Sequence, residues 1–263
     1  MSDHQAPAIQ SGLPFADKVR EVGTDEPFRW LTAGWRDFRR SGIISLAHGL
    51  VFVAAGFLLT VALAAAGLVY LIAPLIVGFM LVGPALTVGF YGISRDIEAG
   101  RGPSFSGAFL AWRANPFPLL GLGLALVLFL IVWMRLAAMI FAICFPYTTL
   151  DVQALLNAAL FTQEGITFLA IGTIVGGFMA TLAFTFGAFS LPLLLDRKVG
   201  ILEAIATSAV AVVLNAKAMA VWAALVVLFT AAGLAAGYVG LAVTLPLIGH
   251  ATWHAYRGSV RWL

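Results

Sequence analysis

The chain has 263 residues, of which 62% are hydrophobic and only 10% are charged, and its mean hydropathy is +1.01. Soluble globular proteins carry about 25% charged residues, so most of this protein's surface is expected to face lipid. The net charge of +3 does not indicate nucleic-acid binding, because the basic residues are spread over short segments and form no single stripe. Cys144 is the only cysteine, which excludes an intramolecular disulfide.

Residues 1–27 are polar and rich in proline, glycine and other small residues. They lack the basic segment followed by an apolar segment that defines a secretory signal peptide. A segment of this composition buries too little apolar surface to offset the entropy of ordering. We therefore predict a disordered cytoplasmic tail over residues 1–27.

Residues 28–42 have the pattern of an amphipathic helix, in which aromatic residues and a leucine form one stripe and arginines lie on another face. This combination is typical of a helix that lies in the membrane interface against anionic headgroups. The residues predicted to contact lipid or the interface are Arg29, Trp30, Trp35, Arg36, Arg39 and Arg40. The alternative is a soluble helix packed on a cytoplasmic loop.

Four runs without Asp, Glu, Lys or Arg organise residues 43–263, which we assign to one transmembrane domain. The runs are Ser41–Ser94, Ala114–Met134, Gly165–Leu195 and Ala218–Tyr256, with 54, 21, 31 and 39 residues. Crossing the hydrocarbon core takes about 20 helical residues, so these runs hold two, one, one and two helices. The predicted fold is all-α: a polytopic membrane helix bundle with six transmembrane helices.

The basic residues predict the orientation of these helices. With the N-terminus in the cytoplasm, 14 of the 15 Lys and Arg residues fall in cytoplasmic segments. The positive-inside rule therefore predicts that both termini are cytoplasmic. The remaining basic residue, Arg135, is expected near the outer headgroups. There it snorkels to the interface, binds an anionic lipid headgroup, or pairs with Asp151 or Glu164.

An internal repeat is visible when the chain is shifted by 100 residues. The shift aligns an aspartate, a glycine, an asparagine and a Val-Leu-Phe triplet: Asp96 with Asp196, Gly100 with Gly200, Asn115 with Asn215, and residues 127–129 with 227–229. Both copies begin on the same side of the membrane, so the pattern predicts a parallel repeat related by an axis along the membrane normal.

Candidate chemistry is sparse. The sequence has no phosphate-binding glycine loop, zinc-protease motif or nucleophile elbow, and no acidic residue lies within a predicted span. His250 and His254 are one turn apart, and His48 is expected at a similar depth. Three imidazoles at one level are able to hold a haem or a metal ion. The alternative is an ordinary interfacial belt with the neighbouring tryptophans and tyrosine, and no cofactor is then expected.

Several motifs resemble a known family. They are Trp30-Leu31 with Gly34-Trp35-Arg36-Asp37, Ser45-Leu46 with Gly49-Leu50, Gly83-Pro84, Tyr91 to Arg95, and the ending Leu247 to Arg257. Together they resemble domain of unknown function 2189, a group of predicted bacterial integral membrane proteins. The resemblance implies a multi-helix protein of the inner membrane without an established activity. Some relatives are labelled as related to cytochrome c oxidase subunit I, but this chain has too few helices and histidines for a haem-copper centre.

These observations favour a non-enzymatic accessory or scaffold protein. Its expected partners are the lipid bilayer, anionic lipid headgroups and other membrane proteins, and no nucleic acid. A channel or transporter for a small solute is the first alternative, with a path lined by Thr87, Thr173, Thr181, Thr185 and Ser190. A haem or metal protein using the three histidines is the second.

Overall fold

A computed structural model describes residues 12–145 and 152–261 of the chain, and its named elements in these ranges are all helical. Within the described residues, strand-like pairing is limited to one isolated antiparallel bridge between Val19 and Val260. The predicted all-α class is confirmed. Residues 1–11 of the predicted tail, and Asp151, lie outside the described residues.

Five stretches of the described chain are long and apolar enough to cross a membrane. Three are single helices: α2 (Ile43–Ala65), α6 (Pro116–Cys144) and α11 (Ala216–Ala235). Two are broken: α3 (Ile72–Leu86) is followed by α4 (Val88–Glu98), and α8 (Gln163–Gly187) is followed by α9 (Ser190–Asp196). The remaining elements are η1 (Ala16–Lys18), α1 (Glu26–Ser41), η2 (Val69–Leu71), α5 (Phe105–Leu110), η3 (Ala111–Ala114), α7 (Val152–Phe161), α10 (Ile201–Leu214) and α12 (Leu241–Ser259).

The sixth predicted crossing corresponds to α12, which is not among the five. Its second half carries polar residues, His250, Thr252, His254 and Arg257, that lower its hydropathy. The turn between α11 and α12 also stops short of the far end of α2. Tyr238 in this turn bonds through its hydroxyl to Thr60 at 3.0 Å, about 7.5 Å before α2 ends.

Side chains satisfy the backbone groups that the two helix breaks release. Between α3 and α4, the Thr87 hydroxyl donates to the carbonyls of Gly83 and Pro84 at 3.1 and 3.0 Å. Between α8 and α9, Ser208 accepts from the Phe189 N–H at 3.1 Å and donates to the Thr185 carbonyl at 3.0 Å. Apolar surroundings offer no water for these groups, so the side chains make the breaks tolerable.

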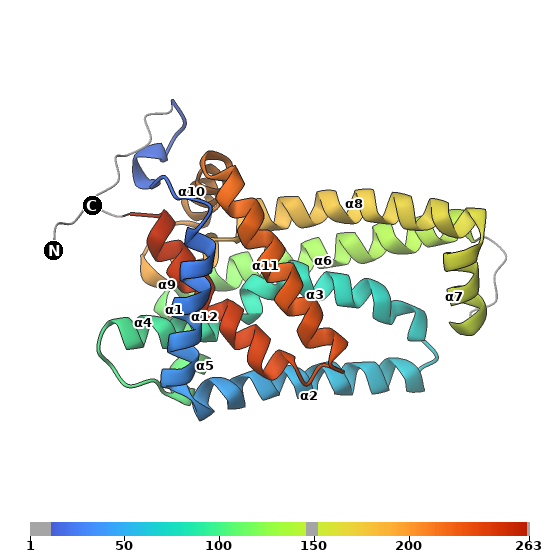
Figure 1. Cartoon of the computed structure of the whole chain (residues 1–263), viewed down its shortest axis with the longest axis horizontal. Helices are drawn as coiled ribbons and strands as arrows, with labels where there is room; N and C mark the ends of the chain where they lie inside the picture. The colour runs from blue at the N-terminus through green and yellow to red at the C-terminus, as the bar shows by residue number, and fades with distance from the viewer. Residues whose placement is uncertain (1–11, 146–151, 262–263) are drawn as a thin grey trace.

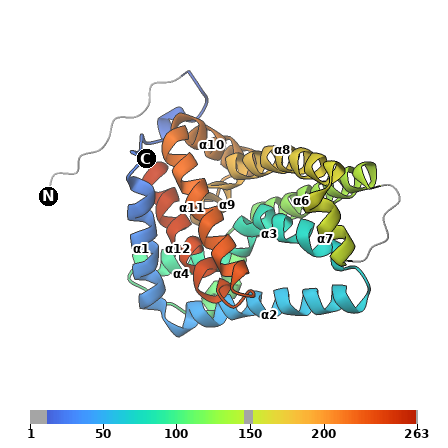
Figure 2. The ribbon, with the colours of Figure 1, turned by 45° about the vertical axis from the view of Figure 1, so that its right-hand side comes forward.

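The helices α2, α6 and α8 run along the long axis, and α1 lies across one end of the bundle (Figure 1). Figure 2 shows the same crossing after rotation, with α12 beside α1 and with α7 at the opposite end. Large apolar side chains of the long helices are exposed, for example Phe57 at 55%, Leu58 at 72% and Ile174 at 73%. Side chains of this kind at the surface are expected where lipid replaces water.

The prediction of a disordered tail is wrong for residues 16–22. Val19 is fully buried, and the Arg20 N–H donates to the Ser259 carbonyl at 2.8 Å. The Val22 N–H donates to Asn215 Oδ1 at 2.9 Å. These contacts fix the segment between the end of α12 and the junction of α10 with α11, a partnership that local composition does not reveal.

Candidate functional site

A buried polar network joins α1, α2, α4 and α12. At its centre is Asp37 of α1, which is 6% exposed. Asp37 Oδ2 accepts a hydrogen bond from Ser94 Oγ at 2.7 Å and lies 2.8 Å from His254 Nε2. A buried carboxylate requires such partners, because an isolated charge is costly away from water.

His250 extends this network into α2. Its Nδ1 lies 2.8 Å from Ser94 Oγ, and its Nε2 lies 2.8 Å from Ser45 Oγ. Because Ser94 donates its hydroxyl hydrogen to Asp37, its oxygen must act as the acceptor toward His250. Nδ1 of His250 therefore carries a hydrogen and donates it to Ser94 Oγ. Nε2 then accepts from Ser45, whose hydroxyl oxygen is 2.6 Å from that of Ser41. We call the six residues Ser41, Ser45, Asp37, Ser94, His250 and His254 the Asp37 network.

Glycines bring the helices close enough for this network to form. A Cβ on Gly34 of α1 would lie 2.6 Å from the backbone nitrogen of Ala251. A Cβ on Gly49 of α2 would lie 2.6 Å from the carbonyl oxygen of Ala242. Both contacts involve α12 backbone, so α12 packs directly on α1 through its second half and on α2 through its first half.

The Asp37 network holds a charge but is closed to substrates. Burial by itself raises the pKa of Asp37, but hydrogen bonds from His254 and Ser94 lower the pKa more, so it lies below its ordinary value of 3.8. Ser45, which contacts a histidine as a nucleophile would, is 0% exposed. The network meets the surface only at His254, whose side chain is 28% exposed. It offers neither a reachable nucleophile nor a continuous path across the bundle.

The three predicted histidines do not meet at one point. His250 and His254 belong to the same network, but His48 packs among aromatic rings, with centroid distances of 4.8 Å to Phe90 and 5.0 Å to Phe109. His48 Nδ1 is buried and has no hydrogen-bond partner in the described structure. Within residues 12–145 and 152–261, no group of three or more His, Cys, Asp or Glu is placed to hold a metal ion.

Sequence reasoning missed Asp37, because an acidic residue in an arginine-rich helix is normally exposed to solvent. A second stripe was nevertheless visible in α1. Trp30, Gly34, Asp37 and Ser41 recur at four, three and four residues, and the structure buries all four. Small and polar residues on one face of a helix favour close packing on another helix, and that signal identifies the face that α12 covers.

The predicted interface residues of α1 fall into two groups. Trp35 is 44% exposed and stacks on Phe38 with ring centroids 5.4 Å apart. The cations in this group are all exposed: Arg29, Arg36, Arg39 and Arg40. Trp30 needs a correction, because it is 3% exposed and packs edge-on against Trp222, which leaves almost no surface for lipid.

Arg135 is exposed on α6, about 28 Å along the helix from Pro116. In the described structure it forms no ion pair with Glu164, which lies in the first turn of α8. The other proposed partner, Asp151, lies outside the described residues. Contact with a lipid headgroup stays a prediction for this residue.

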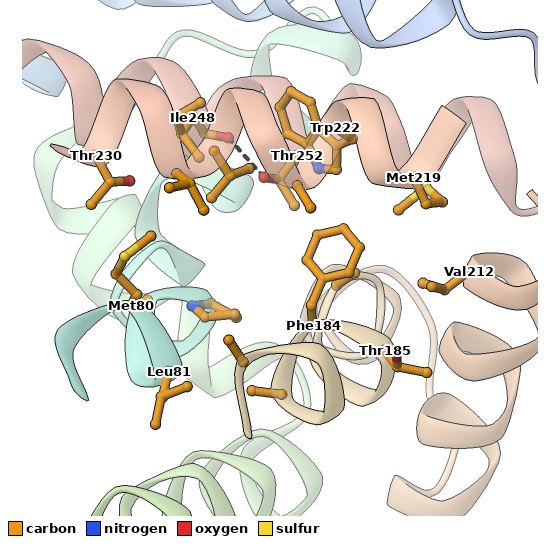
Figure 3. Close-up of a pocket in the computed structure, with 18 of the residues that line it drawn as sticks. Met80, Leu81, Phe184, Thr185, Val212, Met219, Trp222, Thr230, Ile248 and Thr252 are labelled. Atoms are coloured by element: carbon orange, nitrogen blue, oxygen red, sulfur yellow. Dashed lines mark hydrogen bonds between the residues drawn. The ribbon is translucent and has the colours of Figure 1, made fainter. Parts of the chain in front are cut away.

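The residues predicted to line a solute path fall into two groups, those that border a cavity and those that do not. Thr87, Thr181 and Thr185 border a cavity of about 640 Å³ between α3, α8, α11 and α12, shown in Figure 3. Thr173 and Ser190 do not border it.

Comparison with known proteins supports the family resemblance. Residues 71–196 match the family described as predicted integral membrane protein (DUF2189), which confirms the resemblance over that part of the chain. The matched region runs from η2 to the end of α9, so the motifs quoted before and after it lie outside the match. No curated protein and no solved structure matches the chain significantly.

Proposed function

We propose that this predicted integral membrane protein is a non-enzymatic accessory or scaffold protein of the bacterial inner membrane. It holds anionic lipid headgroups through α1 and presents its long apolar helices to other membrane proteins. One observation supports this most: α1 lies across the bundle end with arginines and aromatic rings exposed, whereas the polar groups suited to chemistry are sealed inside.

The two exposed surfaces of α1 lie on either side of its buried stripe. Phe28, Trp35 and Phe38 follow one side of the helix, and Arg29, Arg36 and Arg40 follow the other. Arg29 is paired with Asp25 and Glu26 at 3.0 and 2.9 Å. Rings that enter the acyl boundary beside arginines that meet phosphates are what an interfacial helix requires.

The proposal includes six membrane helices with both termini in the cytoplasm. The antiparallel bridge places Val19 beside Val260, so the described segments before α1 and after α12 lie together. This supports an even number of crossings with α12 as the sixth. The parallel repeat is supported by the breaks after α3 and α8, about 100 residues apart. It is also supported by Arg95 Nη1, which donates at 2.8 Å to the carbonyl of Leu195, 100 residues further along.

Cysteine labelling tests the topology. In a Cys144→Ser background, Gly102→Cys before α5 and Gln163→Cys at the start of α8 place single thiols at opposite ends of the bundle; both positions are exposed. A membrane-impermeant maleimide is expected to label Gln163→Cys in intact spheroplasts and Gly102→Cys only after permeabilisation. Labelling of both without permeabilisation, or the reverse pattern, contradicts a cytoplasmic N-terminus.

A charge-removing variant of α1 tests the lipid-binding role. We expect Arg36→Gln/Arg39→Gln/Arg40→Gln to retain several-fold less phosphatidylglycerol after detergent extraction, because each cation near the surface contributes about 1 kcal/mol of attraction to anionic lipid. Native mass spectrometry counts the retained lipids. The matched triple lysine variant keeps the charge and is expected to retain the lipid. Equal retention in the glutamine variant rejects the role of α1.

A facilitator for a small solute is the second candidate, because three of the five predicted path residues border the cavity. The two functions differ in liposomes. An accessory protein leaves the release of trapped small neutral and anionic solutes unchanged, whereas accelerated release by the purified protein overturns the accessory proposal.

A further inference from the structure

The cavity between α3, α8, α11 and α12 lies apart from the Asp37 network and from the exposed side of α1. Its volume of about 640 Å³ falls in the range of ligand sites, roughly 300–1,000 Å³. Most of its lining is alkyl or aromatic, and Figure 3 shows Phe184, Trp222, Met80 and Met219 around the open space. An apolar ligand is therefore the suitable occupant.

Three of the hydroxyls in the lining are already bonded to the protein's own backbone. Thr181 donates to the Gly177 carbonyl at 2.8 Å, and Thr252 donates to the Ile248 carbonyl at 2.7 Å. Thr87 bonds the carbonyls at the break after α3. These three side chains have used their single donor, which leaves few polar groups for a solute and favours an apolar ligand.

The cavity opens sideways, onto the surface that faces lipid. Six of its lining residues are exposed, among them Val213 at 60%, Val227 at 51%, and Thr181. Val227 belongs to α11, one of the candidate membrane spans. A lateral opening at membrane depth meets acyl chains rather than water.

The dimensions favour a single hydrocarbon chain over a partner helix. The lining residues of α11, from Ala216 to Thr230, span about 21 Å at helical rise. Spread over that length, 640 Å³ corresponds to a mean cross-section of about 30 Å². A helix of 10 Å diameter has a cross-section of about 80 Å², more than twice that value, which favours a hydrocarbon chain as the occupant.

A cation stands at one end of the opening. Lys217 is exposed in the first turn of α11, directly after Ala216, which borders the cavity. By the positive-inside pattern this end is cytoplasmic. An ammonium group there is placed for the phosphate of a lipid whose chain enters the cavity.

We propose that this cavity is a binding site for one acyl chain of an anionic phospholipid from the cytoplasmic leaflet, with Lys217 meeting the headgroup. The site goes beyond the accessory role and uses none of the α1 residues on which that role depends. It therefore stands or fails separately.

Trp222 provides the measurement, because it is 1% exposed and borders the cavity. The full-length protein is reconstituted into phosphatidylglycerol vesicles with brominated acyl chains, whose bromines quench tryptophan emission on contact. The difference in emission between the wild type and the Trp222→Phe variant gives the contribution of Trp222. We expect this signal to fall at least two-fold in brominated vesicles, because only a chain inside the cavity reaches the ring.

Matched variants complete the test. Ala223→Phe fills the cavity and is expected to restore the Trp222 emission, whereas Ala125→Phe on the exposed face of α6 leaves the quenching unchanged. Native mass spectrometry, which does not need Trp222→Phe, should count one phosphatidylglycerol fewer on Ala223→Phe than on the wild type. Unquenched Trp222 together with equal lipid counts overturns the site. Equal quenching by brominated phosphatidylcholine overturns the role of Lys217 in selecting the headgroup.

Discussion

Replacing Asp37 by alanine is expected to lower the free energy of unfolding by about 3 kcal/mol, the scale measured when one partner of a buried charge pair is removed. The change leaves the Ser94 hydroxyl and His254 Nε2 without the oxygen on which both converge. Since His250 bonds to Ser94, the loss extends to the contact of α4 with α12. Thermal unfolding in detergent, followed by tryptophan fluorescence, measures the effect.

Asp25→Ala is the matched control, because the Asp25 side chain is 66% exposed and pairs with the equally exposed Arg29. Solvent screens such pairs, so little change in unfolding temperature is expected. Acid gives a second check. The folded pKa of Asp37 lies below 3.8, so its stabilisation is present above that value and disappears as pH falls through the folded pKa. The gap between wild type and Asp37→Ala should close below about pH 4, and a gap independent of pH contradicts an ionised Asp37.

Adding one methyl group at Gly34 or Gly49 is expected to destabilise the bundle by about 1–3 kcal/mol, as in other overpacked cores. Each new Cβ would lie 2.6 Å from a backbone atom of α12. Backbone does not move aside as a flexible side chain does, so α12 must separate from α1 or from α2. The same fluorescence unfolding assay on Gly34→Ala and Gly49→Ala measures the loss.

Gly172→Ala provides the comparison. Gly172 lies within α8, and a Cβ there meets nothing within 4 Å. Alanine is favoured over glycine in a helix interior by up to about 1 kcal/mol, so this variant should be as stable as the wild type or slightly more stable. Stability losses of equal size at all three glycines contradict the packing of α12 that the structure shows.

The positions of the long helices were largely predictable. The uncharged run that begins at Ser41 contains α2, and the run from Ala114 to Met134 forms the body of α6. Hydropathy reports the length of an apolar segment, not its continuity. It therefore predicted neither helix break. The backbone groups released at the breaks are bonded by Ser208 through a tertiary contact and by Thr87 through a local contact, and hydropathy does not report such bonds.

The site was predictable only in part. The spacing of His250 and His254 placed them correctly on one side of α12, and both belong to the Asp37 network. His48 was expected at a similar depth in the membrane, but its ring packs among aromatic rings and does not join the network. The stripe of Trp30, Gly34, Asp37 and Ser41 indicates that Asp37 faces another helix, but no local pattern identifies its partner His254, which is 217 residues away.

That separation has a consequence for how the protein is made. Asp37 leaves the ribosome long before His254, and at about 5–20 residues per second the interval is about 10–40 s. During this time the face of α1 that α12 later covers lacks its partner. Only synthesis of the last helix completes the Asp37 network. The bond between His254 and Asp37 is therefore absent from every nascent chain that ends before His254.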